Sequence, residues 1–469
     1  MNRTENLPSS IVSLGTALRE RRLSPVEVVS TLLERIDEVD EELNAFVTVL
    51  PEKALGEAAR AEKEIMSGAY RGPLHGVPVG IKDLTCTEGV RTTMGSAFFE
   101  DYVPEEDATV VSKLKTAGAI VLGKTNTHEF AYGPTGDRSL FGPTTNPHDP
   151  GRISGGSSSG SGAAVAAGLC YAALGSDTAG SIRIPSSLCG VVGMKPTFGR
   201  VSKQGVFPLA WTLDHVGPIA RTVEDNALLL NTIAGYDQAD PYSSNRPVED
   251  FARDLTREIR NGTVGVPEDF YSEHVEDGVM RRIREAIDTF RSLGAEVREV
   301  AIPNLRETLR AQRLTLAAEA YAIHEERLES APEKFDEETR EYLLDSERLK
   351  AHRYARAQQT RRRSLEEFQL ALAGGVDVLL TPTVPITATE VGQREVEIGG
   401  YGESVYSALT RLTGPTNFNG LPSLSIPCGS TRSGLPVGLQ IVGRPFDEAT
   451  VYGYGHAYES IASARPTTP

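Results

Sequence analysis

Residues 152–197 read RISGGSSSGSGAAVAAGLCYAALGSDTAGSIRIPSSLCGVVGMKPT. The segment holds two clusters of glycine and serine, at residues 155–161 and 175–181, which flank a run of small residues. Glycine permits backbone conformations that other residues resist, and it lets a ligand approach the main chain closely. Two such clusters beside one packed helix predict a site built largely from backbone N–H groups and serine hydroxyls.

Hydrophobic patterning outside this segment predicts an α/β protein. Short apolar runs such as Val79–Ile81 and Ile120–Leu122 alternate with amphipathic helices, one of which begins at a capping box in Ser24–Glu27. Strands that alternate with helices favour a parallel or mixed sheet covered by helices. We therefore expect an α/β/α sandwich with a mixed central sheet. We expect a single domain over residues 1–469, with a helical, substrate-selecting insert at about residues 305–373.

Composition and charge argue against several classes of partner. The chain has 469 residues and a formal net charge of −16, whereas phosphate binding requires clustered lysine and arginine. The one basic cluster, Arg361–Arg363, lies in a glutamate-rich helix, and we interpret it as a solvated face. The sequence has no run of 18 apolar residues and no apolar signal-peptide core in Met1–Ser10. We expect a cytoplasmic protein with no nucleic-acid partner and no membrane partner.

The cysteines and histidines give no sign of a metal site. The four cysteines lie far apart in the sequence and lack metal-ligand spacing, and they are Cys86, Cys170, Cys189 and Cys428. Reduced thiols are the simplest interpretation, although Cys170 and Cys189 could approach each other. His128 and Glu129 suggest a metal or acid–base role, but no second histidine lies at a metal-motif spacing. We therefore expect no metal and no cofactor.

Four motifs of the chain resemble those of a known family. They are Gly80–Asp83, Gly155–Ser161, Gly175–Pro185 and Gly190–Thr197. Together they look like the signature of the amidase signature family, the serine amidases with a Ser–cis-Ser–Lys triad. The resemblance in layout extends from about Leu14 to the C-terminus, with a signature core at about residues 74–200. It implies the amidase signature fold.

The resemblance assigns three catalytic residues. Cleaving an amide requires an activated nucleophile, stabilisation of the oxyanion and a proton for the leaving amine. Ser181 matches the nucleophile, and Ser157 matches the bridging serine that follows a cis bond from Gly156. Lys82 matches the general base that acts through Ser157. Without the resemblance, a lysine that ends an apolar strand would be interpreted as extending to the surface.

Further site residues follow from the same motifs. The backbone N–H groups of the nucleophile's turn are candidates for the oxyanion hole, and they belong to Thr178, Ala179, Gly180 and Ser181. By alignment the acyl and leaving-group pocket would be lined by Ala131, Tyr132 and Gly133. Three matched positions are expected to support the catalytic residues, namely Ser158, Asp177 and Arg183. Arg183 could instead contact an anionic substrate. Ser159 and Ala179 stand where the family usually has glycine.

The resemblance implies a hydrolase that cleaves a C–N acyl bond through an acyl-enzyme. The substrates would be water and a small amide, an aryl amide or a carbamate (urethane), and a homodimer is compatible with the family. The alternative is the A subunit of a tRNA-dependent amidotransferase, which releases ammonia from glutamine. That subunit usually carries an acidic residue where this chain has Thr410, followed by Arg411, and its Gly-Tyr-Tyr segment is absent from residues 340–363. A stand-alone hydrolase is therefore the expectation.

Two other interpretations of the glycine-rich loop are weaker. Residues 156–160 satisfy the G-x-S-x-G pattern of α/β-hydrolases, with Ser158 as nucleophile and His324 or His456 as its base. That elbow should directly follow a strand, whereas residues 146–150, Asn-Pro-His-Asp-Pro, are unsuited to one. A phosphate-binding loop would require G-x-x-x-x-G-K-[ST], which this segment lacks.

Overall fold

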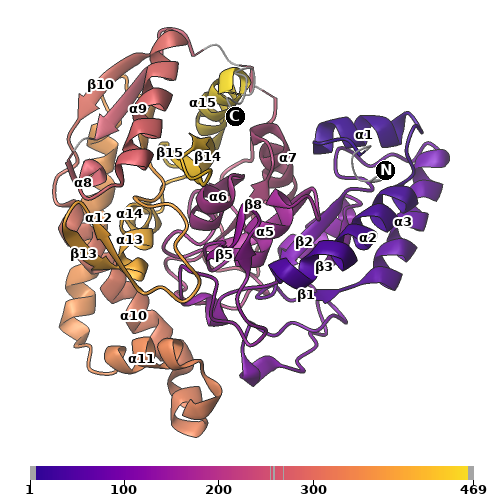
Figure 1. Ribbon diagram of the computed structural model, residues 1–469, viewed down its shortest axis with the longest axis horizontal. Coiled ribbons are helices and arrows are strands. Elements are labelled where there is room, and N and C mark those ends of the chain that lie inside the picture. The colour runs from indigo at the N-terminus through magenta and orange to yellow at the C-terminus, as the bar shows by residue number, and fades with distance from the viewer. Residues whose placement is uncertain (1–6, 254, 257–258, 268, 463–469) are drawn as a thin grey trace.

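One mixed sheet of eleven strands runs through the protein (Figure 1). The computed structural model describes residues 7–253, 255–256, 259–267 and 269–462. The strands lie in the order β1-β3-β2-β6-β8-β7-β14-β15-β11-β9-β10. Their bounds are β1 Phe46–Val49, β2 Pro78–Lys82, β3 Ile120–Thr125, β6 Ala172–Asp177, β7 Val192–Lys195, β8 His215–Ala220, β9 Thr263–Pro267, β10 Glu296–Val300, β11 Val378–Pro382, β14 Ser423–Ser430 and β15 Pro436–Val442.

Strand directions determine where the polar ends of the strands meet. Strand β2 is parallel to β3 and β6, whereas the strands from β6 to β11 along the sheet pair in antiparallel fashion. In the pairing of β2 with β6, Val79 lies opposite Ala172 and Ile81 opposite Leu174. The end of β2 at Lys82 therefore lies beside the end of β6, where the second glycine–serine cluster begins. The predicted α/β/α sandwich on a mixed sheet is confirmed.

Helices pack on the sheet and extend beyond it. Their bounds are α1 Ile11–Arg19, α2 Pro25–Leu43, α3 Pro51–Met66, α4 Thr109–Thr116, α5 Ser159–Ala166, α6 Arg183–Cys189, α7 Val223–Ile233, α8 Asp269–Ser272, α9 Asp277–Ser292, α10 Leu305–Ser330, α11 Glu337–Ser346, α12 Ala351–Ala371, α13 Val405–Arg411, α14 Gly414–Asn419 and α15 Glu448–Ala462. The capping box predicted at Ser24 is present at the start of α2. Helices α10 and α11 project away from the sheet (Figure 1).

Two segments form more strand than the sequence predicted. Residues 146–150 contribute to a short hairpin of β4 (Thr145–Asn146) and β5 (Asp149–Ile153). Proline is tolerated there because Pro150 is exposed on a two-stranded ribbon rather than inside the main sheet. The strand predicted at Ile120–Leu122 continues to Thr125, because residues 123–125 pair with Gly80–Lys82 of β2. The side chain of Lys124 is buried there and donates hydrogen bonds to Thr85 and Thr92. A second hairpin, β12 (Glu395–Ile398) and β13 (Tyr401–Ser404), lies outside the main sheet.

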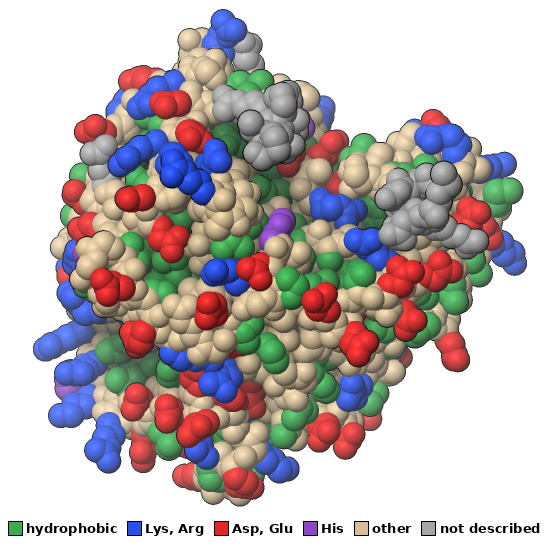
Figure 2. Space-filling model, in the orientation of Figure 1, with side chains coloured by type: hydrophobic (Ala, Val, Ile, Leu, Met, Phe, Trp, Pro, Cys, Tyr) green, Lys and Arg blue, Asp and Glu red, His purple; other side chains and the backbone are tan. Residues whose placement is uncertain are grey.

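The arginine cluster of α12 differs from the prediction of a fully solvated face. The guanidinium of Arg361 donates a hydrogen bond to the carbonyl of Thr212 and lies 5.7 Å from the ring centres of Phe198 and Phe418. Consecutive residues of a helix point about 100° apart, so Arg361 faces the protein while Arg362 is exposed. Elsewhere on the face seen in Figure 2, acidic and basic side chains are interspersed among apolar ones.

The structure also bears on the predicted state of the cysteines and on the predicted absence of a membrane-spanning helix. All four cysteines are free thiols, so Cys170 and Cys189 do not pair. The Cys189 thiol instead donates to the carbonyl of Ser154, 3.2 Å away. Within the described part of the chain, every helix is too short or too polar to span a lipid bilayer.

Candidate active site

Lys82 ends strand β2 in a fully enclosed position. Its side chain is 1% exposed, so it does not extend to the surface. Its Nζ lies 2.7 Å from Ser157 Oγ and 2.9 Å from Ser176 Oγ. Burial lowers the pKa of Lys82 to about 7, although the nearby Asp177 and Asp214 carboxylates oppose the shift. A large fraction of this amine is therefore neutral near physiological pH and able to accept a proton.

Ser157 lies in the first glycine–serine cluster, and neighbouring backbone holds it. The Gly156–Ser157 peptide bond is cis, as the resemblance implied. The Gly156 N–H donates to the carbonyl of Pro134, and the carbonyl of Ser157 accepts from the N–H of His128 at 3.2 Å. A side chain at Gly156 would meet the backbone of residues 133–136, at distances down to 2.7 Å. Only glycine fits at this position.

The turn that carries Ser181 lies directly beside the Ser157 loop. The N–H of Ser158 donates to the carbonyl of Ser181 at 3.2 Å, and this bond joins the two loops. Ser181 itself is 6% exposed. The preceding Gly180 has a φ of +134°, and a Cβ there would lie 2.4 Å from Thr413 Oγ1. The turn therefore needs glycine immediately before the candidate nucleophile.

Asp177 organises the turn from within. Its carboxylate accepts hydrogen bonds from the N–H groups of Gly180 at 2.7 Å and Ile182 at 3.1 Å. The Gly180 N–H is thus already bonded, so a transition-state oxygen would compete with Asp177 for it. Burial raises the pKa of Asp177, but the charges of Arg183 and Lys195 and the hydrogen bonds from Arg183 and Asn417 together hold that pKa well below its usual range.

Arg183 is fully buried and joins the turn that carries Ser181 to the C-terminal part of the chain. Its Nε and Nη2 donate to the two oxygens of Asp177, each at 3.0 Å. Its remaining donors reach the carbonyl of Thr413 and the side chains of Thr416, Asn417 and Gln440. Because both terminal nitrogens and Nε already donate to protein atoms, the geometry supports the structural role for Arg183 and not contact with an anionic substrate.

Replacing Arg183 by methionine is expected to destabilise the fold by about 3–5 kcal/mol. The reason is that removing one member of a buried ion pair leaves the other charge uncompensated. Chemical denaturation of the wild type and the variant measures the difference. Arg291→Met is the control, because Arg291 and its partner Asp288 are both exposed and such surface pairs contribute about 0–1 kcal/mol. Equal losses for the two variants would contradict a special role for Arg183.

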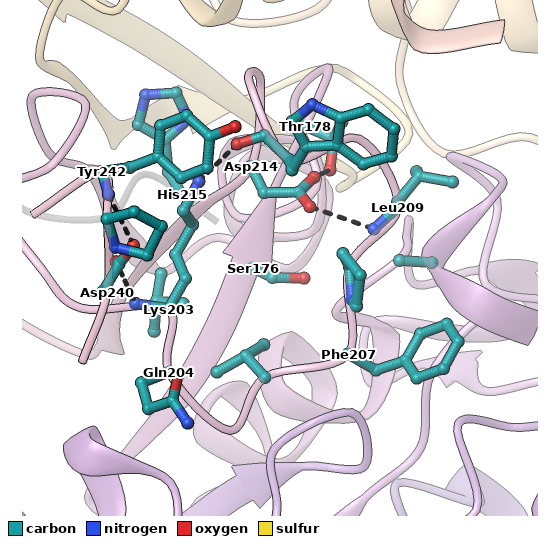
Figure 3. Close-up of a pocket in the computed structure, with 16 residues that line it drawn as sticks. Ser176, Thr178, Lys203, Gln204, Phe207, Leu209, Asp214, His215, Asp240 and Tyr242 are labelled. Carbon is teal, nitrogen blue, oxygen red and sulfur yellow. Dashed lines mark hydrogen bonds between the residues drawn. The ribbon is translucent and has the colours of Figure 1, made fainter. Parts of the chain in front are cut away.

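A cavity of about 210 Å³ opens beside these residues (Figure 3). Two of its lining residues lie close to the candidate triad. Ser176 contacts Lys82, and Thr178 lies in the turn that leads to Ser181. Figure 3 shows Phe207 and Leu209 on one side of Ser176, and Lys203, Asp240 and Tyr242 on the other. Asp214 anchors the cavity wall to the turn, since its Oδ1 accepts from Thr178 Oγ1 at 2.6 Å. The cavity adjoins the candidate triad through Ser176 and Thr178, whereas the three triad residues are not among those that line it.

Of the three residues predicted to line the substrate pocket, one lines the cavity and two pack against other side chains. Ala131 lines the cavity. The ring of Tyr132 packs 5.5 Å from that of Tyr342 on α11, and Gly133 lies against the ring of His128. Their roles in substrate binding stay predictions. The amides of the Ser181 turn also stay predictions as an oxyanion hole.

The geometry does not support a nucleophile elbow at Ser158. Its hydroxyl donates to the carbonyl of Ser176 at 3.1 Å and accepts from the N–H of the same residue at 3.2 Å. His324 lies among aromatic rings, with the centre of Phe130 4.3 Å away, and burial lowers its pKa to about 3. His324 is therefore part of the aromatic cluster around Phe130, and within the described part of the chain it makes no hydrogen bond to Ser158.

Sequence reasoning missed several groups that complete the site. Ser176, which contacts Lys82, follows Gly175 in the second glycine–serine cluster, so a local signal was available. Thr413 lies in no motif of the signature, yet its hydroxyl donates to the carbonyl of Ala179 at 2.6 Å. Gln312 of α10 reaches the carbonyl of Thr178 at 3.4 Å. Only the tertiary fold brings these last two residues to the turn.

Comparison with known proteins identifies the family of the chain. The amidase family model matches residues 27–452. The chain belongs to the amidase signature family. It is therefore an amide-hydrolysing enzyme, and its fold is the amidase signature fold.

Relatives of this amidase are similar over nearly their whole length. The A subunit of glutamyl-tRNA(Gln) amidotransferase from Geobacter metallireducens is 40% identical over 480 residues, which cover 97% of each chain. The structure of the corresponding A subunit from Thermotoga maritima is 37% identical, with a TM-score of 0.80 over 95% of this chain and 93% of that one. A structure described as a vestigial complex that reveals the origins of an s-triazine catabolic enzyme is 34% identical, with a TM-score of 0.93 over 96% and 98%.

These names correct one expectation from the sequence. A stand-alone amidase or urethanase was the preferred interpretation, whereas the names of the curated relatives favour the alternative, the A subunit of an amidotransferase. The same names include a tRNA, so they do not support the expectation of no nucleic-acid partner, which stays a prediction.

Proposed function

We propose that this amidase cleaves a small carboxamide by acyl transfer to Ser181. The observation that carries the proposal is the enclosed contact between Lys82 and Ser157, 2.7 Å apart, beside the turn that holds Ser181. Neutral Lys82 accepts the proton of Ser157, and Ser157 accepts that of Ser181 as the Ser181 oxygen attacks the amide carbon. The carbonyl oxygen becomes negative and is stabilised by backbone N–H groups of the turn.

The same relay supplies the proton for the leaving nitrogen. Lys82, protonated in the first step, returns a proton through Ser157 to the departing amine or ammonia, and the ester on Ser181 remains. Water then attacks that ester, with Lys82 again accepting a proton. Lys82 suits both directions because its pKa of about 7 lies near the operating pH.

Glutamine is the first donor to consider, and the support comes from the relatives. Similarity to an amidotransferase A subunit covers 97% of this chain at 40% identity. Under this proposal the chain releases ammonia from glutamine for a partner that acts on glutamyl-tRNA(Gln), as the name of the relatives suggests. Its partners would then be the other subunits of such an enzyme.

A stand-alone hydrolase of another amide or carbamate is the second candidate, and one observation favours it. Thr410 and Arg411 occupy the segment where an acidic residue is expected to recognise glutamine. Neither of these residues has a carboxylate. The Arg411 guanidinium is instead paired with Glu403 at 3.1 Å and donates to the carbonyl of Glu273. Recognition of the ammonium group of glutamine would need another carboxylate.

Ammonia or amine release from a small panel separates the two candidates. The panel contains glutamine, acetamide, benzamide, acetanilide and an aryl carbamate, each tested with the isolated chain and with co-expressed amidotransferase subunits and glutamyl-tRNA(Gln). Glutamine hydrolysis that rises with the partners supports the A-subunit function. Equal or faster turnover of another member by the isolated chain supports the stand-alone hydrolase. Full activity of Ser181→Ala on every member would overturn the proposal as a whole.

A further inference from the structure

The cavity beside the candidate triad has a largely apolar wall with one distinctive member. Trp211, the only tryptophan in the sequence, lines it together with Phe207, Pro208 and Leu209. The segment 206–216 approaches the catalytic turn at Thr178, which bonds to Asp214. A group attached to the scissile amide would therefore enter a space bounded by Trp211.

Three charged side chains from different segments form hydrogen bonds to Trp211 and Thr212. Lys203 Nζ donates to the carbonyl of Trp211. Glu319 of α10 accepts both from the N–H of Thr212, at 3.0 Å, and from the Thr212 hydroxyl, at 2.6 Å. Arg361 of α12 donates to the carbonyl of Thr212. Bonds in which one partner is charged are the stronger class of hydrogen bond, so they hold these two adjacent residues firmly.

The bonds to this loop explain the burial of Glu319. The residue is 1% exposed, and besides Thr212 it accepts a hydrogen bond from the Tyr354 hydroxyl at 2.8 Å. A buried carboxylate is costly unless it is fully hydrogen-bonded. Here two of its bonds fix the position of the residue that follows Trp211. Helices α10 and α12 therefore set the position of the cavity wall.

The size and chemistry of the cavity select a class of ligand. An apolar cavity of about 150 Å³ is large enough to bind benzene. The cavity here, of about 210 Å³, thus has room for one aromatic ring together with the amide group. Aromatic rings gain stability from packing against one another in addition to the burial of their area.

We propose that Trp211 is a specificity-determining residue that packs against an aryl group of the amide substrate, and that Glu319 and Arg361 are positioning residues for it. The inference rests on the proposed amide hydrolysis at Ser181 and favours the second candidate, an amide other than glutamine. An aryl group on the acyl side, as in benzamide, and one on the amine side, as in acetanilide, are distinguished by experiment.

Steady-state kinetics of Trp211→Ala test the specificity role. We expect the ratio of kcat/KM for benzamide or acetanilide to that for acetamide to fall by about tenfold or more, because the aryl group loses its packing partner. Trp211→Phe should restore most of the ratio. The control is Tyr236→Ala, an exposed aromatic residue that is not among those lining the cavity. An unchanged ratio in Trp211→Ala would overturn the proposal.

Glu319→Gln tests the positioning role separately. The amide keeps one oxygen for the Thr212 N–H, but its NH2 group makes the Thr212 and Tyr354 hydroxyls accept instead of donate, so the charge-assisted bonds that hold Thr212 are weakened. We expect KM for the aryl amide to rise several-fold with a smaller change in kcat, and the tryptophan emission maximum to shift. A variant whose kcat/KM falls equally for aryl and small amides would indicate a merely structural role for Glu319.

Binding measured without turnover keeps this inference distinct from the proposed function. Because Trp211 is the only tryptophan, its fluorescence reports directly on the cavity wall. Titrating Ser181→Ala with benzamide and with acetanilide should change the emission in a saturable manner, whereas acetamide should not. No change with either aryl amide would overturn the role of Trp211. Hydrolysis that survives in Ser181→Ala would overturn the proposed function alone.

Discussion

Ser181→Ala is expected to lower kcat/KM for any amide substrate by about 10⁴- to 10⁶-fold. The methyl group cannot form the acyl ester, and only binding and oxyanion stabilisation would remain to accelerate the reaction. Initial rates with the best substrate of the panel give the size of the loss. Mass spectrometry of the rapidly quenched wild type should detect the acyl group on the peptide that contains Ser181, and this adduct should be absent from the variant.

A matched control is available on the next helix. Ser187 of α6 is buried, and its hydroxyl makes no hydrogen bond within the described part of the structure. Ser187→Ala removes the same atom from a similar environment, so it should retain activity within about threefold. An acyl adduct on any residue other than Ser181 would contradict the assignment of the nucleophile.

Lys82→Met is expected to reduce kcat/KM by at least about 10³-fold, because general-base catalysis is lost and Ser181 keeps its proton. Lys82→Arg should be nearly as inactive, since a guanidinium retains its proton at any working pH. Under the proposed mechanism, the reactive form of Lys82 in the wild type is the neutral amine. Activity should therefore rise with pH, about tenfold for each unit below the pKa, and level off above about pH 7.

Lys124 provides the comparison for this pH profile. It is equally buried, and burial lowers its pKa to about 8 despite the opposing charge of Asp83. Its Nζ bonds to Thr85 and Thr92, and none of these bonds involves a triad residue. Lys124→Met should lower stability and leave the rise near pH 7 in place. A rise that persists in Lys82→Met and moves in Lys124→Met would reverse the roles of the two lysines.

Local sequence signals predicted the parts of the fold and of the site that depend on near neighbours. The capping box at Ser24 and the apolar run at Val79–Ile81 formed the expected helix and strand because their determinants lie within a few residues. The motif resemblance placed Lys82 and Ser157 in one site, and these two side chains do meet.

Contacts that depend on the order of strands were beyond such reasoning. Gln440 meets Arg183 because the fold packs the first turn of α6 against β15, and no periodicity in either segment indicates the pairing. Arg361 was misjudged for a similar reason, since a run of charges cannot reveal which member faces a loop 149 positions earlier in the chain. Residues 146–150 were misjudged because a two-stranded ribbon tolerates prolines that a central strand does not.

The Arg183 contacts impose an order on how activity can appear during synthesis. Thr413 lies 230 positions after Arg183, and Gln440 lies 257 positions after it. When a ribosome has made the triad residues, these partners do not yet exist, and a charged guanidinium beside an unfinished turn has only water and Asp177 to bond. Acyl transfer should therefore begin only when almost the entire polypeptide has emerged. Incomplete chains would be unable to hydrolyse amides in the cell, although Lys82, Ser157 and Ser181, the proposed catalytic residues, are already present in them.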